Sequence, residues 1–213
     1  MLTSLDATSA LAASVAGLGA ILGARYWRLL CSSRRWAVSF LVVSALSAVV
    51  ADSLRVSGHA NAWVGNLWQL SVVGLLLPGV VQAVPGQDRV IYRSIQRGLV
   101  LTWVIYFILL RHLFEFTTLF HASACIAVVF ASLSMLYSLC FTEPSLPRSP
   151  AFLLGVGAAL ACAFDVIPHS GFIEWSLKGE SLFIATWVVR NVAWAAGYLV
   201  MTYSVYVEGR YGC

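Results

Sequence analysis

Polar and aromatic side chains recur on one face of the last apolar stretch of the chain. Four of them follow the spacing i, i+3, i+4 and i+7, which places them on the same side of a helix: Trp187, Arg190, Asn191 and Trp194. An arginine keeps its positive charge in proteins, and a charge within an apolar stretch is costly unless it faces the interior of a bundle. We therefore expect this face to point into a helix bundle, with Arg190 at the centre of a polar site.

Two carboxylates are candidate partners for Arg190. Asp165, near the end of the preceding apolar stretch, is the first candidate, and Asp52, near the end of the second stretch, is the other. A buried ion pair with a purely structural role is one interpretation of this arginine. A site for an anionic or carboxylate ligand is another, and a gating or proton-linked role is a third. The spacing leaves open which aspartate meets Arg190.

The remaining candidate residues come from the third and fifth apolar stretches. Asn66 and Gln69 lie three residues apart and so share one helix face, from which they can hydrogen-bond a ligand held by Arg190. Trp68 is expected to form an apolar wall with the two tryptophans of the last stretch, and His121 lies within the fifth stretch. All these residues fall toward one end of the bundle, whereas the other half is nearly all apolar. This pattern predicts a ligand-binding polar pocket that opens toward one side.

The composition identifies lipid as the solvent for most of these stretches. Hydrophobic residues make up 60% of the 213 residues and charged residues only 10%, which is more apolar surface than a soluble domain of this size can bury. About 20 helical residues cross the hydrocarbon core, and the fourth stretch is the shortest, so it either crosses fully or re-enters. We expect an all-α, polytopic membrane helix bundle in which residues 1–213 form a single domain with seven transmembrane helices: 8–24, 36–53, 63–83, 98–112, 117–140, 150–167 and 181–206.

Basic residues are unequally shared between the two sides of this predicted bundle. Nine arginines fall on the side of the C-terminus, among them Arg89, Arg93 and Arg97 in the connection after the third stretch, against three basic residues on the other side. Short basic loops stay in the cytoplasm, so the N-terminus is expected outside and the C-terminus inside, in a multi-pass protein of a bacterial inner membrane. The net charge of +4 follows from this asymmetry and does not indicate a nucleic-acid partner.

Sequence motifs for metal, cofactor or catalytic chemistry are absent. The chain has no His-Glu-x-x-His or Cys-x-x-Cys motif, no Gly-x-Ser-x-Gly motif, and no two histidines four residues apart. The five cysteines are expected to be small buried hydrophobic residues. We expect no metal site, no cofactor and no catalytic residue. A hydrolytic pair made of Asp52 and Asp165 is the last of the alternatives.

Glycines and one proline predict how the helices pack. Gly19 and Gly23 form a Gly-x-x-x-Gly motif, and Gly157 and Gly197 lie in the sixth and seventh stretches. Small residues of this kind allow two membrane helices to approach closely. Pro78 is expected to kink the third stretch near its end, because proline removes a backbone donor and clashes with the preceding turn.

The predicted plan of seven helices with an outside N-terminus resembles that of microbial rhodopsins and of G-protein-coupled receptors. Retinal binding is disfavoured because the seventh stretch has no lysine, and Lys178 lies before it. The chain is more similar to small bacterial seven-helix membrane proteins that have no known activity, and this resemblance implies a fold and a location but no mechanism. The segments that carry it are Asn61-Ala-Trp63-Val-Gly-Asn66-Leu-Trp68-Gln69 and Arg190-Asn191-Val-Ala-Trp194.

These observations favour a membrane sensor or small-ligand-binding protein. The expected ligand is small and anionic or amphipathic, and the short predicted loops imply that any signal passes through a partner protein. The first alternative is a structural or assembly subunit of a membrane complex, in which the polar residues lock helices together. A small carrier or proton-coupled transporter is the next, and an enzyme acting on lipids is the last.

Overall fold

Every apolar stretch forms a helix in the computed structural model of the chain, which describes residues 2–84, 88–110, 118–142, 149–169 and 180–212. The predicted all-α class is therefore confirmed. Within the described residues the third rod is made of three consecutive helical segments, and the fourth rod of two. The seven rods are α1 (Leu2–Tyr26), α2 (Ser32–Val56), α3 (Ala62–Ser71) with a π-helical turn (Val72–Leu76) and α4 (Leu77–Val81), α5 (Asp88–Trp103) with a second π-helical segment (Val104–Leu109), α6 (Thr118–Thr142), α7 (Pro150–His169) and α9 (Glu180–Tyr211).

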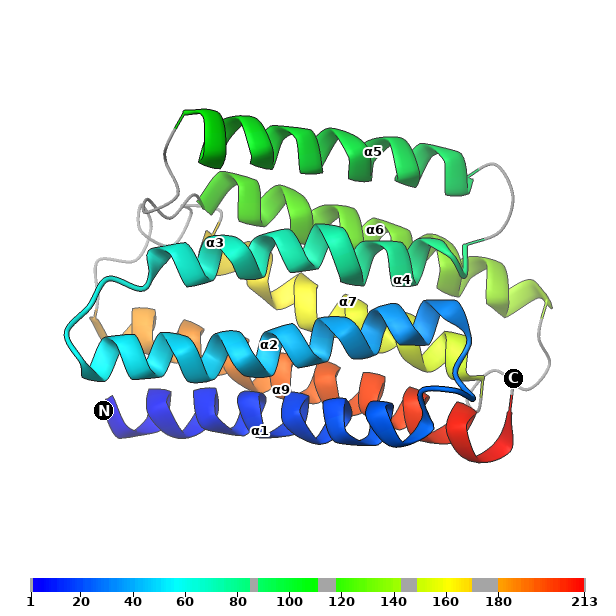
Figure 1. Cartoon of the computed structure of the whole chain (residues 1–213), viewed down its shortest axis with the longest axis horizontal. Coiled ribbons are helices and arrows are strands. Elements are labelled where there is room, and N and C mark those ends of the chain that lie inside the picture. The colour runs from blue at the N-terminus through cyan, green and yellow to red at the C-terminus, as the bar shows by residue number, and fades with distance from the viewer. Residues whose placement is uncertain (1, 85–87, 111–117, 143–148, 170–179, 213) are drawn as a thin grey trace.

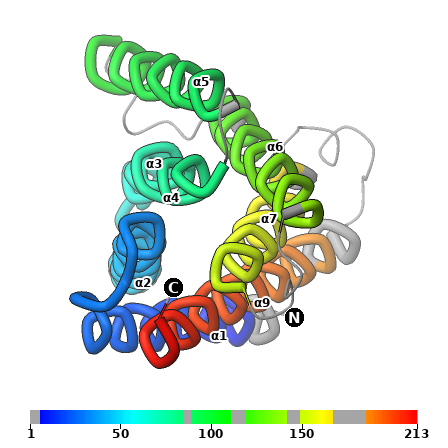
Figure 2. The backbone as a smooth tube through the Cα atoms, turned by 90° about the vertical axis from the view of Figure 1, so that its right-hand side faces the viewer, coloured from blue at the N-terminus to red at the C-terminus, as the bar shows by residue number. Residues whose placement is uncertain are grey.

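The rods run alongside one another, and the two termini lie at opposite ends of the bundle (Figure 1). Viewed end-on, α1, α2, α3–α4, α6, α7 and α9 follow one another around a ring that closes where α9 packs on α1 (Figure 2). Helix α5 stands outside this ring and packs against α4 and α6. The ring therefore encloses the side chains that α1, α2, α3, α6 and α9 direct inward.

Four helices in the described part of the chain are long and apolar enough to cross a bilayer. They cover Asp6–Tyr26, Ser32–Val56, Ala62–Val81 and Leu119–Phe141, and Pro150–Val166 is a shorter apolar helix. Large apolar side chains also cover the outer surface, for example Leu46 on α2 and Phe130 on α6, each 60% exposed. Such an outer surface is suited to lipid rather than to water, which is consistent with a membrane protein.

The fourth helix begins ten residues earlier than the sequence predicted, at Asp88 instead of residue 98. Arg89, Arg93 and Arg97 therefore lie on α5 and not in a loop, so that expectation was wrong. The reason is that arginine is a good helix former and these three recur every four residues, so they make one polar face of a helix that hydropathy alone does not detect. Arg89 also caps the C-terminal end of the preceding rod. Its guanidinium donates to the carbonyl oxygens of Gln82 and Val84, both at 3.0 Å. The predicted end of this stretch, at residues 111 and 112, lies outside the described residues.

Pro78 is accommodated by a change in helix geometry. The chain forms a π-helical turn over Val72–Leu76, immediately before α4, and the rod then continues through Pro78 to Val81. The proline ring clashes with the backbone of the preceding turn, and a wider π-helical turn at this point relieves that clash. The distortion falls at the expected place in the third helix.

The close helix approach predicted from the glycines is confirmed for α7 and α9. A Cβ atom added at Gly157 would lie 2.7 Å from the carbonyl oxygen of Gly197, and one added at Gly197 would lie 2.7 Å from the backbone nitrogen of Ala161. Both distances are shorter than van der Waals contact and involve backbone atoms, which cannot rotate away. The two helices therefore touch through their main chains, and this contact holds the spacing between the residues that α7 and α9 carry farther along.

Replacing Gly197 by alanine is expected to destabilise the bundle by about 1–3 kcal/mol, the usual cost of forcing extra volume into a packed interior. Gly17→Ala on α1 is the matched control, because nothing lies within 4 Å of a Cβ atom there. That control should be neutral or stabilising by up to about 1 kcal/mol through the higher helix propensity of alanine. Unfolding by sodium dodecyl sulfate, followed by circular dichroism, measures both. Equal effects at the two glycines would contradict a backbone contact between α7 and α9.

Candidate functional site

Arg190 on α9 is held by one carboxylate and two indole rings. Its Nε donates to Asp165 Oδ1 on α7, so the first of the two candidate partners is the one that the fold places there. The guanidinium carbon lies 4.3 Å from the ring centroid of Trp187 and 3.8 Å from that of Trp194. These two tryptophans lie one turn before and one turn after Arg190 on the same face of α9. Cation–π contacts and a charge-assisted hydrogen bond together fix the orientation of this side chain. Arg190 keeps 9% of its surface exposed.

Asp165 joins a third helix to this pair. Its second oxygen, Oδ2, bonds to Nε2 of His121 on α6. Asp165 and His121 are both fully buried, and a carboxylate without such partners would be too costly at this position. We refer to His121, Asp165 and Arg190 as the charge cluster. It links α6, α7 and α9 inside the bundle.

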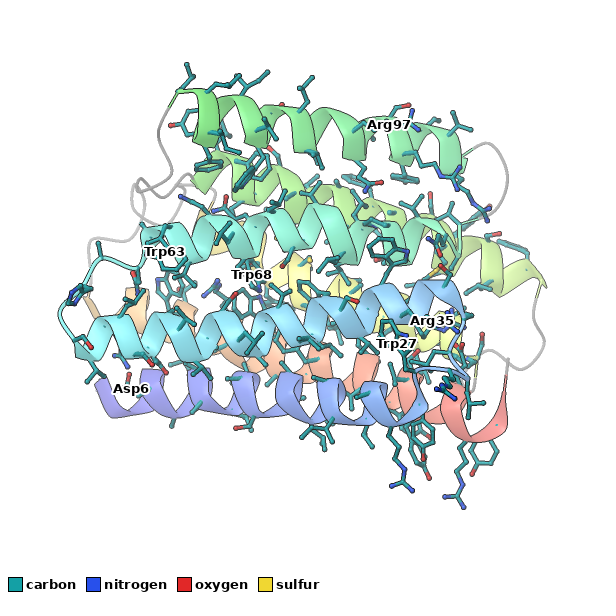
Figure 3. All side chains as sticks on the ribbon, in the orientation of Figure 1. Asp6, Trp27, Arg35, Trp63, Trp68 and Arg97 are labelled. Atoms are coloured by element: carbon teal, nitrogen blue, oxygen red, sulfur yellow. The ribbon has the colours of Figure 1, made fainter. Side chains whose placement is uncertain are left out.

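Trp68 brings α3 to the same place. Its ring centroid lies 5.3 Å from that of His121 and 4.8 Å from that of Trp194. The indole Nε1 donates to Ser44 Oγ on α2 at 3.1 Å. Figure 3 shows Trp68 between α2 and α3, the two helices that this hydrogen bond joins. An indole with its nitrogen bonded in this way is a rigid apolar surface.

A cavity of about 210 Å³ lies beside the charge cluster, and we call it the chamber. One wall is made of small residues on α1 and α2, and the facing wall carries larger polar and aromatic side chains from α3, α6 and α9. Six of the residues predicted to bind a ligand are in these walls. The chamber is lined by Ser9, Ala12, Ala13, Ser44, Ser47, Ala48, Ala51, Asp52, Val64, Gly65, Trp68, His121, Arg190, Asn191, Trp194 and Tyr198.

Asp52, the second candidate partner of Arg190, has a different position. It bonds to Arg55 at 3.1 Å, one turn away on α2, and its side chain is 54% exposed. Arg55 also bonds to Asp6 on α1, at 2.8 Å. Asp52 therefore lies at the exposed rim of the chamber rather than in the charge cluster, and Arg190 and Asp52 line the same cavity without forming a pair that the structure records.

Four of the predicted residues are not in the chamber walls. Asn66 and Gln69 share a face, as their spacing indicated, and both are fully buried. Neither side chain lines the chamber, and the indole nitrogen of Trp103 on α5 donates to the backbone carbonyl of Asn66 at 3.0 Å. Asp165 lies behind Arg190 as its partner, and Trp187 covers the guanidinium. Asp165 and Trp187 therefore position Arg190 without lining the cavity themselves.

A second buried ion pair, which the sequence did not predict, lies at the opposite end of the bundle. Arg34 on α2 pairs with Glu208 on α9, and Glu208 also accepts from the backbone nitrogen of Cys31. The side chain of Glu208 is fully buried and that of Arg34 is 8% exposed. The expectation that this half of the bundle is nearly all apolar was therefore wrong.

The predicted last span stopped at residue 206, whereas α9 continues to Tyr211. Glu208 lies four residues after Ser204, so both fall on one face of α9, and both are buried. This spacing is the sequence signal from which a buried Glu208 could have been predicted.

A second missed feature adjoins the charge cluster. Cys125 follows His121 by four residues on α6, and its Sγ lies 3.7 Å from His121 Nε2 and 3.6 Å from Asp165 Oδ2. These three side chains form a group of potential metal ligands within the described part of the chain. A search restricted to histidine pairs overlooks it, because the sequence signal is His-x-x-x-Cys on one helix with an aspartate on another.

The helical fold, its apolar outer surface and its buried charges define a bundle of the membrane-protein type. Comparisons with protein-family models, with curated proteins and with solved structures found no match. The chamber and the charge cluster are the features from which we infer a function.

Proposed function

We propose that this chain is an integral membrane protein that binds a small ligand in the chamber and acts through a partner protein. The observation that carries the proposal is the composition of the chamber wall. A fixed cation, an imidazole, an amide and two indoles from three helices face a cavity whose other lining residues are mostly alanine and serine. The exceptions are Val64, Gly65, Tyr198 and, at the exposed rim, Asp52. A mostly apolar cavity with a few convergent polar groups is the usual form of a ligand site.

The size and charge of the chamber indicate the class of ligand. At about 210 Å³ it is smaller than the roughly 300 Å³ at which sites for drug-sized molecules begin, so the ligand is smaller than these. Asp165 engages Nε of Arg190, and the Nη edge of a guanidinium carries its other N–H donors, which suit a carboxylate. Trp68 and Trp194 offer apolar surface beside it. A small anionic or amphipathic molecule fits these groups.

The placement in the membrane is part of the same proposal. We infer seven crossings in a bacterial inner membrane, with the N-terminus outside, the C-terminus in the cytoplasm and the chamber opening outward. The basic residues support this topology, because Arg35 and Arg97 lie toward the end of the bundle opposite Asp6 (Figure 3), and basic residues favour the cytoplasmic side. Protease removal of an N-terminal tag, but not of a C-terminal tag, from spheroplasts is the expected result. The reverse pattern would contradict the topology.

Filling the chamber is the test that leaves the charge cluster intact. Ala13 lines the chamber from α1, and Ala10, three residues earlier on the same helix, is exposed on the outer surface. Ala13→Leu should therefore occlude the ligand, whereas Ala10→Leu adds the same atoms outside. We expect wild type and Ala10→Leu, extracted gently from their own membrane, to release the same small molecule on denaturation. Ala13→Leu should release at least tenfold less, with an unchanged melting temperature.

Liquid chromatography with mass spectrometry identifies and quantifies the released molecule. An equal amount from all three proteins would place the ligand outside the chamber. No common small molecule, together with a stoichiometric protein that copurifies with every variant, would favour the alternative of a structural subunit.

A further inference from the structure

Two adjacent helices direct four potential metal ligands into the seam between them. His121 and Cys125 lie four residues apart on α6, and Cys162 and Asp165 lie three residues apart on α7, so each pair occupies one helix face. All four side chains are buried, with at most 3% of any residue exposed. Such a set combines two thiols, an imidazole and a carboxylate.

Three of these side chains already lie close enough to share a metal ion. The ligand atoms of His121, Cys125 and Asp165 all lie within 4.8 Å of one another. Cys162 is the neighbour of Cys125 on α7, and its thiol turns toward the ion when the ion binds. Tetrahedral zinc, with bonds of about 2.3 Å to sulfur and about 2.0–2.2 Å to nitrogen or oxygen, separates a sulfur from its neighbouring ligands by roughly 3.5 Å. The Cys125 sulfur already lies 3.7 Å from His121 Nε2 and 3.6 Å from Asp165 Oδ2.

We propose that His121, Cys125, Cys162 and Asp165 form a binding site for a zinc-class divalent cation. Thiolate and imidazole donors select such borderline ions over magnesium or calcium, which take oxygen ligands. The hydrogen bond between His121 and Asp165 belongs to the metal-free state, and the ion takes its place between Nε2 and Oδ2. Arg190 keeps its bond to Oδ1, and in that position it orients the carboxylate from outside the coordination shell.

Two thiolates suit this site in an apolar interior, because they offset the charge of a divalent ion. On binding, two S–H bonds break, two metal–sulfur bonds form, and two protons leave. The His121 nitrogen that binds the ion carries no proton. The ion and the two thiolates sum to zero, so they add no net charge to the pair of Asp165 and Arg190. His121 is also in the chamber wall, which gives ions and protons a path to the site.

This site shares His121 with the chamber wall, but its test uses the metal alone, so its outcome does not depend on the ligand proposed for the chamber. The metal content of the purified protein is measured by elemental mass spectrometry, and cobalt(II) is added to the metal-free protein as a spectroscopic probe. We expect one ion per chain and the intense visible bands of tetrahedral cobalt with sulfur-to-cobalt absorption in the near ultraviolet. At least two protons, one from each thiol, should be released per ion into a weakly buffered solution.

Substitutions of single cysteines locate the binding. Cys125→Ser and Cys162→Ser should each weaken binding by at least tenfold and shift the cobalt spectrum, whereas Cys140→Ser, at an exposed position on α6, should leave both unchanged. Melting of the metal-free proteins checks that each variant folds, and Cys125→Ala serves where the serine variant does not. Octahedral cobalt bands, or equal loss of metal in Cys140→Ser, would identify adventitious surface binding and overturn the proposal. So would the absence of any bound ion in the folded wild type.

Discussion

Asp165→Asn is expected to lower the free energy of unfolding by about 3–5 kcal/mol, the usual cost of leaving one member of a buried ion pair without its partner. The substitution keeps the shape of the side chain but removes the charge that neutralises Arg190. It also weakens the bond to His121, so three helices lose contacts at once. Unfolding by sodium dodecyl sulfate, followed by circular dichroism, measures the loss.

Two further variants separate charge from shape at this position. Asp52→Asn is the matched control, because Asp52 is more than half exposed and exposed ion pairs contribute at most about 1 kcal/mol. Replacing both partners, as Arg190→Met with Asp165→Leu, should recover most of the stability, since apolar pairs often substitute for buried ion pairs without loss. A double variant no more stable than Asp165→Asn would show that the charge cluster does more than neutralise Arg190.

Glu208→Gln is the second substitution with a large expected effect, again about 3–5 kcal/mol. Glu208 binds Arg34 and the backbone nitrogen of Cys31 just before α2, so it ties the end of α9 to the turn between α1 and α2. We therefore expect hydrogen exchange to rise over residues 27–35 as well as in the last turn of α9. Arg210→Gln, in the same last turn but exposed, should change neither stability nor exchange. Unaltered exchange in Glu208→Gln would mean that packing alone holds this end together.

The apolar stretches predicted the helices well because a run of Leu, Val and Ala long enough to cross a bilayer has few other ways to satisfy its backbone. Asp165 was the first of two candidate partners for Arg190, since both lie on helices adjacent in the chain, but the spacing left the choice between Asp165 and Asp52 open. The start of α5 was not foreseeable, because hydropathy falls where Arg89, Arg93 and Arg97 enter, although the helix continues through them.

What the sequence could not provide is the rotation of each helix about its own axis. The spacing of Asn66 and Gln69 indicates a shared face, but not that both are buried outside the chamber walls while Gly65 and Trp68 line the chamber. In the same way, the spacing places His121 with Cys125 but does not indicate that α7 turns Asp165 toward them. Such convergence depends on contacts such as the one between Gly157 and Gly197, which single-helix patterns do not contain.

Native mass spectrometry of the wild-type protein, extracted gently from its own membrane, tests the central claim most directly. We expect the intact chain to carry one small organic molecule, over and above any metal ion, and to lose it on collisional activation before the chain unfolds. A chain that carries no organic molecule would contradict ligand binding in the chamber, and a chain that travels with a stoichiometric protein partner instead would identify the buried polar residues as architecture.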